Sequence, residues 1–305
     1  MTRKPKIDAT KTITDLFIAK LEAGTKPWVR PWAGLSIRPR RHNGVAYTGI
    51  NTLYLWAVAD AHGFESPYWM TVKQANDLGG KINADKRSAI SVYYSMGQGV
   101  STDRAAGEAT TTSFRFMRAY SVFNADQITG LPAHYYNRTD IPAVSRVEQR
   151  RQLKAFFDAI PVSIEYRGSS AYYAPGPDKV VMPPVHLFKS LDHFASTKLH
   201  EIGHWTGAKH RLNRTFGKRF GDDAYAAEEL VAEILSGIAG AELGLPAEML
   251  DNHASYIDHW LRILRADKTA IIKAASKAEQ ALQYLKSFNG QSDALPLTAE
   301  RSHPA

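Results

Sequence analysis

The sequence predicts an α+β protein of two domains. Its 305 residues exceed the usual size of one domain, helical and strand-like hydrophobic periods occur in both halves, and the excess positive charge lies in the first half. A proline-containing segment separates the halves. We therefore expect an N-terminal domain at 1–130, a linker at 131–146, a second domain at 147–290 and a flexible tail without motifs at 291–305.

The N-terminal domain is expected to combine helices with one hairpin. Its expected elements are helices at about 8–23, from Asn51 and from Thr71, and strands at about 90–96 and 113–123. The polar segment 97–112 between the strands predicts a long hairpin tip. Aromatic residues from Phe114 to Phe123 alternate with Arg115 and Arg118. These give either a basic and aromatic face or the charges that keep an edge strand soluble.

The second domain is expected to begin with a helix and a short β-meander. Its expected elements are a helix at 148–159, strands at 162–166, 171–173 and 179–182, and helices at about 190–207, 225–242 and 252–288. A meander just before a metal-binding helix favours a zincin layout, in which an edge strand binds an extended peptide. We assign that edge strand to Lys179–Met182.

The helix expected at 190–207 carries the H-E-x-x-H pattern, as His200-Glu201-Ile202-Gly203-His204. Residues four apart lie on one face of a helix, so His200 and His204 can bind one metal ion, and Glu201 can take a proton from a water beside it. Ser190 is the expected N-cap and Gly207 the expected end. Two incidental histidines on an amphipathic helix are the alternative, and the helical context favours the metal site.

A catalytic zinc site usually has three protein ligands, and two residues compete for the third position. His210 would complete the pattern H-E-x-x-H-x-x-G-x-x-H, but the methionine turn that accompanies it is missing. Glu229, on the helix after Gly221, would give a His2Glu site, and we favour it. Glu233, one turn further, is the expected residue to hold a ligand histidine, whereas Glu228 is expected to face solvent.

The rest of the composition limits the environment. The sequence has no cysteine, which excludes disulfides, Cys-ligated zinc and thiol catalysis. The basic N-terminus is not followed by the apolar segment of a secretory signal, and no run of apolar residues is long enough to cross a membrane. We expect a cytoplasmic protein with no membrane partner.

The positive charge indicates a polyanionic partner for one half. Residues 1–150 hold 20 Lys+Arg and 12 Asp+Glu, a net charge of +8, whereas 151–305 hold 18 of each. Tryptophans are interleaved with these cations, and this combination is typical of proteins that bind single-stranded nucleic acid. The candidate nucleic-acid contacts are Lys26, Trp28, Arg30, Trp32, Arg38, Arg40, Arg41 and Tyr47. Trp56 and Trp69 have the spacing expected of core residues.

Several segments of the chain resemble the ArdC-type antirestriction proteins of conjugative plasmids. They are Asn51–Trp56, Tyr120–Ile128, Tyr172–Pro184, His200–Gly207, Arg211–Arg214 and Tyr225–Glu233, and the likeness covers most of residues 8–290. The resemblance implies a domain that binds single-stranded DNA joined to a metallopeptidase-like domain. It also implies a third ligand in the Glu228-Glu229-Leu-Val-Ala-Glu233 helix, in agreement with Glu229, and no need for histidine at the position of His210.

The leading hypothesis is an antirestriction protein that binds incoming plasmid DNA as a single strand and carries a peptidase site. That site would use one divalent ion, Zn²⁺ or else Mn²⁺ or another ion, held by His200, His204 and Glu229. Its substrate would be a protein such as a restriction enzyme or another host protein. One alternative is a DNA-masking protein with a structural metal, and the other is a repair protease for proteins crosslinked to DNA.

Overall fold

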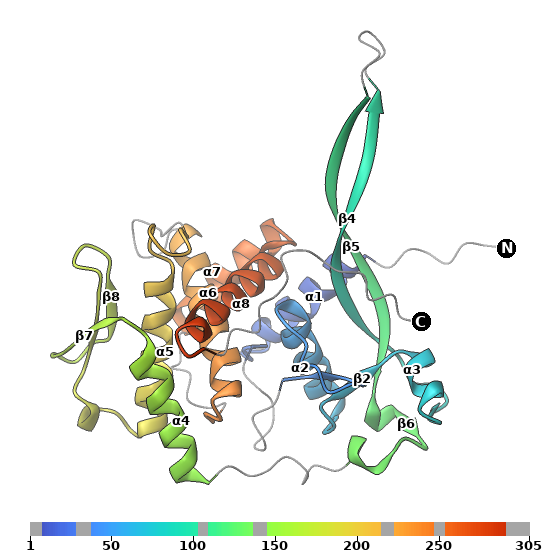
Figure 1. Ribbon diagram of the computed structural model, residues 1–305, viewed down its shortest axis with the longest axis horizontal. Coiled ribbons are helices and arrows are strands. Elements are labelled where there is room, and N and C mark those ends of the chain that lie inside the picture. Colours follow the sequence, from blue (N-terminus) through green and yellow to red (C-terminus); the bar gives the residue numbers. More distant parts are fainter. Residues whose placement is uncertain are drawn as a thin grey trace.

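The computed structural model describes residues 8–28, 38–102, 109–136, 145–214, 223–246 and 254–290. Helices and strands occur in both halves, as predicted for an α+β protein (Figure 1). No helix in these ranges is long and apolar enough to cross a bilayer. Arg30, Trp32 and the predicted tail at 291–305 lie outside the described residues.

The described residues of the N-terminal half form three α-helices and two sheets. Its elements are α1 (Ala9–Glu22), β1 (Arg40–Arg41), α2 (Ile50–His62), β2 (Tyr68–Met70), α3 (Val72–Asp77), β3 (Lys81–Ile82), β4 (Ala89–Thr102), β5 (Ala109–Asn124) and β6 (Ile128–Thr129). One sheet has the order β1-β2-β5-β4 and the other pairs β3 with β6. The helices begin as expected: Asp8 caps α1, and Thr71 forms a capping box with Gln74 on α3.

The hairpin of β4 and β5 is longer than predicted. Its pairing runs from Ala89↔Val122 to Thr102↔Ala109, so the expected polar loop at 97–112 is wrong over most of its length. Threonines at 110–112 favour a strand through their β-branched side chains, although their polarity resembles that of a loop. Figure 1 shows the hairpin standing out from the body of the protein.

The described residues of the C-terminal half form five α-helices and one three-stranded sheet. Its elements are α4 (Arg146–Ala159), β7 (Ser163–Tyr166), β8 (Tyr172–Ala174), β9 (Lys179–Met182), α5 (Leu191–Thr206), α6 (Asp223–Glu242), α7 (Ala254–Ala266) and α8 (Ala270–Ser287). The expected helix at 252–288 is thus two helices. The sheet order is β7-β9-β8, so the prediction that Lys179–Met182 is an edge strand is wrong. Val180, Val181 and Met182 are buried, as in a central strand.

One hydrophobic cluster joins the two halves. It includes Phe17 and Trp56 from the first half and Trp205, Leu235 and Leu282 from the second. Helix α1 packs against α7, and α2 packs against α8. The two halves of the sequence therefore share a core.

The start of the predicted linker also packs against the N-terminal half. Tyr135 is buried in a second cluster with Met70 and Ile128. Its hydroxyl donates to the carbonyl of His42 at 2.7 Å, and its own carbonyl accepts from Ser66 Oγ at 2.8 Å. Residues 131–136 are therefore a structured part of the protein, while 137–144 lie outside the described residues.

Several predicted DNA contacts instead lie inside the protein. Trp28 is fully buried and meets Trp260 edge to face, with 5.0 Å between ring centroids, so its expected role as an exposed stacking platform is wrong. The carbonyl of Trp28 lies only 2.6 Å from where a Cβ on Gly237 would stand, so the chain crosses α6 at a glycine. Tyr47 is also buried, and its carbonyl accepts from Thr52 Oγ1 at 2.6 Å.

Two predicted basic contacts form ion pairs with the second half. Lys26 Nζ lies 3.2 Å from Glu233 Oε1, and both side chains are almost fully buried. Arg38 is buried and bonds to Glu279 at 3.0 Å and to Glu242 at 2.9 Å. Of the other candidates, Arg40 is partly buried and Arg41 is exposed. Because buried charges need partners, Lys26 and Arg38 serve the contact between the halves.

The burial of Trp28 predicts a large loss of stability on truncation. Trp28→Ala should lower the free energy of unfolding by about 3–5 kcal/mol, because it leaves a cavity beside Trp260. Chemical denaturation measures this value. Tyr94→Ala is the control, since Tyr94 is 43% exposed. That substitution should cost about 0.5 kcal/mol or less. A loss below about 1 kcal/mol for Trp28→Ala would contradict the core position.

Candidate metal centre

The close packing of α5 on α6 builds the centre. Ser190 caps α5 by accepting from the His193 N–H at 3.0 Å, and the helix ends at Gly207, both as predicted. A Cβ at Gly203 would lie 3.1 Å from Leu235 Cδ2 and 3.4 Å from Ala232 Cα, both on α6. Glycine between the two histidines therefore lets α5 approach α6 closely. The histidines of α5 then face the carboxylates of α6.

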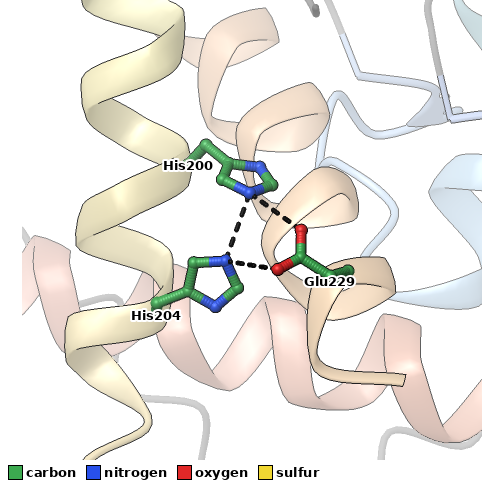
Figure 2. A group of neighbouring side chains, drawn as sticks. All are labelled: His200, His204 and Glu229. Atoms are coloured by element: carbon green, nitrogen blue, oxygen red, sulfur yellow. Dashed lines mark hydrogen bonds and ion pairs between the residues drawn. The ribbon is translucent and has the colours of Figure 1, made fainter. Parts of the chain in front are cut away.

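His200, His204 and Glu229 converge on one point (Figure 2). Nε2 of His200 lies 3.2 Å from Nε2 of His204 and 3.3 Å from Glu229 Oε2, and His204 Nε2 lies 3.4 Å from Glu229 Oε1. Ligand atoms bound at about 2.1 Å around a tetrahedral ion are about 3.4 Å apart. All three side chains are buried. The donor set and its spacing therefore fit a divalent ion, and two imidazoles with a carboxylate suit Zn²⁺.

His204 is oriented by a carboxylate that the sequence analysis expected to face solvent. Glu228 is 4% exposed, and its Oε1 lies 3.4 Å from His204 Nδ1. An acceptor at Nδ1 keeps the proton there and leaves Nε2 free to bind a metal. The expectation of a solvent-facing Glu228 is therefore wrong. The carboxylate expected to hold a ligand histidine, Glu233, forms its ion pair with Lys26.

Arg214 holds Glu228 in place. Its guanidinium donates to both carboxylate oxygens, at 2.9 Å to Oε2 and 2.6 Å to Oε1. It also donates to the Gly203 carbonyl at 2.7 Å and to Thr206 Oγ1 at 2.8 Å, both on α5. Arg214 therefore ties the end of α5 to α6 beside the histidines. The Arg211–Arg214 segment is one of those that resemble the family, but the sequence does not show that Arg214 pairs with Glu228.

The charges around the centre shift the pKa values of its groups. Burial alone would lower the pKa of His204, but Glu228 and Glu229 outweigh it and raise this pKa to about 10. Burial opposes ionisation of Glu229, yet His200 and His204 hold its pKa below the usual range. The charge of Glu201 contributes to the raised pKa of His204. The protein thus gathers negative charge where a cation would bind.

Two tyrosines also reach the centre. Tyr225 lies one turn before Glu229 on α6, and its pKa is raised by burial, by the charge of Glu229 and by a hydrogen bond with Tyr256. The two rings stack with 6.2 Å between centroids. The pKa of Tyr256 is raised by burial and by the charges of Glu229 and Glu201. Tyr256 could not be identified from the sequence, because it comes from α7 and no spacing rule links it to the H-E-x-x-H helix.

His210, the rival third ligand, lies elsewhere. Its side chain is 63% exposed, and its Nε2 lies 3.3 Å from Asp178 Oδ2. Asp178 also receives two hydrogen bonds from Arg211, whose guanidinium stacks on Trp205 at 3.7 Å from the ring centroid. His210 is thus part of a surface cluster. Among the described residues, the carboxylate that lies close enough to His200 and His204 to share a metal ion with them is that of Glu229.

Comparisons with known proteins agree with this architecture. A model of zincin-like metallopeptidases matches residues 151–277, and a model of the N-terminal domain of the anti-restriction factor ArdC matches residues 7–123. The class is therefore an ArdC-type N-terminal domain followed by a zincin-like metallopeptidase domain. The metal-free crystal structure of the antirestriction protein ArdC from plasmid R388 is 39% identical, covers 93% of this chain and 98% of that one, and superposes with a TM-score of 0.77.

The chain belongs to the ArdC antirestriction family. The Mn(II)-bound structure of the R388 protein is similar as well, at 37% identity and a TM-score of 0.76, over 93% of this chain and 99% of that one. The uncharacterized protein y4eC of Sinorhizobium fredii is 34% identical over 94% of each chain. A DNA primase TraC of Escherichia coli is 32% identical over 96% of this chain, which spans 28% of the primase.

Loss of the Glu228 carboxylate should weaken metal binding. Glu228→Gln combined with Arg214→Met removes both members of the ion pair and leaves His204 Nδ1 without its carboxylate. We expect metal affinity to fall by about 10–100-fold, as for other partners of ligand histidines. Titration calorimetry with Zn²⁺ or Mn²⁺ measures it. Glu148→Gln is the control, since Glu148 is a partly exposed carboxylate that also receives two hydrogen bonds from one arginine, Arg151. Equal affinities for the two variants would contradict the role of Glu228.

The raised pKa of His204 predicts a defined pH dependence. A pKa raised from 6.5 to about 10 means that the chelator-treated protein gains stability below pH 6.5 and loses that contribution as pH rises through about 10. Metal binding must displace this proton, so affinity should increase with pH in the same range. Thermal unfolding against pH, compared with His204→Gln, measures the first effect. Calorimetry in two buffers of different ionisation enthalpy measures the second. Metal uptake without proton release at pH 7 would contradict this assignment.

Proposed function

We propose that the chain protects incoming conjugative plasmid DNA from restriction, binds that DNA as a single strand, and carries a metal-dependent peptidase site. Membership of the ArdC family supports the antirestriction role, and the net charge of +8 in the first half supports the polyanionic partner. The observation that carries the peptidase is the convergence of His200, His204 and Glu229 beside Glu201. We place the protein in the cytoplasm, where such DNA arrives.

His200, His204 and Glu229 would hold the metal, and we propose Zn²⁺ from the donor set, with Mn²⁺ the ion bound by the R388 relative. The bound ion would polarise a carbonyl and make a water more acidic. Glu201, next to the first ligand, takes the proton from the attacking water and passes it to the leaving amine. Tyr225 and Tyr256 donate hydrogen bonds to the oxygen that becomes negative. Glu228 and Arg214 keep His204 in place throughout.

An extended peptide would bind along β8. This strand lies at an edge of the three-stranded sheet and contacts α5, whereas β9 is enclosed between its neighbours. An edge strand can pair with an added strand, and strand pairing accepts many peptide sequences. The sequence offers Tyr225, His186 and His193 as oxyanion donors without a choice among them. We prefer Tyr225, since His186 is exposed and His193 packs against Phe188.

A purely structural metal is less well supported. Structural zinc sites usually have four protein ligands, and the group found among the described residues has three. A masking protein would also have no use for a carboxylate beside the first ligand. A repair protease for crosslinked proteins would share every residue of this site, so its substrate rather than its geometry distinguishes it.

The experiment that tests this function distinguishes the role of Glu201 as the base from that of the residues that hold the metal. Glu201→Gln should retain metal and single-stranded DNA while cleavage of a protein substrate falls by about 10²–10⁴-fold. Glu165→Gln, at a partly exposed glutamate of β7, is the control. Cleavage is followed on purified restriction enzyme, and protection by counting transconjugants in a restricting host. Undiminished cleavage by Glu201→Gln would refute its role as the base. Full protection by that variant would favour DNA masking over proteolysis.

A further inference from the structure

We propose that single-stranded DNA binds to one face of the β4–β5 hairpin, formed by Tyr93, Phe116, Arg118 and Tyr120. This face is called the aromatic face below. The proposal rests on the DNA-binding function proposed above and gives it a location. That location is needed because Trp28, Arg38 and Tyr47 are buried, and the Lys26 side chain is 10% exposed and paired with Glu233.

The strand register puts the four side chains on one side of the hairpin. Tyr93 pairs with Arg118, and the pairs two residues to either side are Ser91↔Tyr120 and Ser95↔Phe116. Residues directly opposite in an antiparallel pair, and those two apart along a strand, share a face. Tyr94 and its partner Met117 therefore lie on the other face.

The aromatic face is exposed and preassembled. Tyr93 and Tyr120 are each 40% exposed, and their rings stack at 5.3 Å with only 16° between their planes. Their hydroxyl groups are 3.0 Å apart, and the guanidinium of Arg118 lies 5.1 Å from the centre of the Phe116 ring. Rings that are already fixed by neighbours lose little conformational freedom when a base stacks on them. The arrangement alternates flat rings with a cation, as single-strand binding requires.

The face of the hairpin opposite the aromatic face anchors it to the body of the protein. Ile90 and Val92 at its base are buried in the main core. The side chain of Asn51 on α2 accepts from the Val92 N–H at 2.8 Å and donates to the Val92 carbonyl at 2.7 Å. The hairpin is thus anchored by one face, and the aromatic rings on the opposite face are not needed for that packing.

Charge identifies the partner as a polyanion. Neither β4 nor β5 contains an aspartate or glutamate, and their only ionised side chains are Arg115 and Arg118. At the base of the hairpin Tyr47 is hydrogen bonded to Ser91, and the exposed guanidinium of Arg41 lies 5.5 Å from the Tyr47 ring. Two cations therefore flank the stacked tyrosines. The strand from Ser91 to Ser95 rises about 13 Å, enough for roughly three or four nucleotides.

Substitutions on the two faces of the hairpin test the proposal. Fluorescence anisotropy with labelled oligo-dT measures affinity. Tyr93→Ala with Tyr120→Ala should weaken binding by roughly 5–150-fold for each base that loses its stacking partner. Tyr93→Phe with Tyr120→Phe should bind within about twofold of wild type, since the rings remain. Arg118→Gln should reduce the slope of log affinity against log salt by about 0.7.

Tyr94→Ala is the matched control. It removes the same side chain from the adjacent position, with 43% exposure, on the opposite face. It should leave affinity unchanged. As a second measurement that needs no variant, bound oligo-dT should protect Tyr93 and Tyr120 of the wild type from nitration by tetranitromethane, read by peptide mass spectrometry, while Tyr94 still reacts.

The outcomes separate this location from the function on which it rests. If the wild type does not bind oligo-dT, the DNA-binding function itself is wrong. If it binds and the alanine variants bind equally well, the aromatic face is the wrong location while DNA binding stands. Equal weakening by Tyr94→Ala also overturns the choice of face. Loss of plasmid protection by the alanine variants with unchanged oligo-dT affinity would assign the face to a protein partner and overturn the proposal.

Discussion

The structure depends on the burial of three carboxylates on one helix. Glu228, Glu229 and Glu233 of α6 are at most 5% exposed, and a buried carboxylate is costly unless it is paired. Each is met by different cations: Glu228 by Arg214, Glu229 by the two histidines, and Glu233 by Lys26. The histidines can fill this role as protonated imidazoles or as metal ligands. Helix α6 therefore carries buried negative charge that needs positive partners, and a divalent ion can be one of them.

The same helix makes the halves interdependent. Lys26 and Trp28 reach it from the first half, one pairing with Glu233 and the other crossing at Gly237. Glu229 and Glu233 are one turn apart on α6, so the contact between the halves and the metal centre share a short rigid segment. A change at the contact can thus alter the geometry of the centre without touching a ligand. The family models divide the chain into two domains, whereas the packing gives the two halves a shared core.

Local spacing allowed the sequence to predict the histidine pair, the helix that carries it and the helix that supplies Glu229. These follow from periodicity and capping within a few residues. The roles of Glu228, Arg214 and Tyr256 at the centre depend on how α5, α6 and α7 pack. The sequence of a single helix does not show that packing. The strand order failed for the same reason: four apolar-rich residues identify β9 as a strand, but its two neighbours are set by topology. The hairpin predicted from the sequence was too short, because threonine is polar like loop residues but favours the strand conformation.

The uneven charge has two physical origins, and composition cannot separate them. Lys26 and Arg38 belong to the +8 of the first half, yet their partners Glu233, Glu242 and Glu279 belong to the neutral second half. Part of the asymmetry is therefore an internal attraction between the halves. Only exposed cations can attract DNA and release counterions from it. Arg41 and Arg118 remain on the surface, and the Phe116 ring beside Arg118 is partly exposed. The charge available to attract DNA is therefore smaller than the net charge.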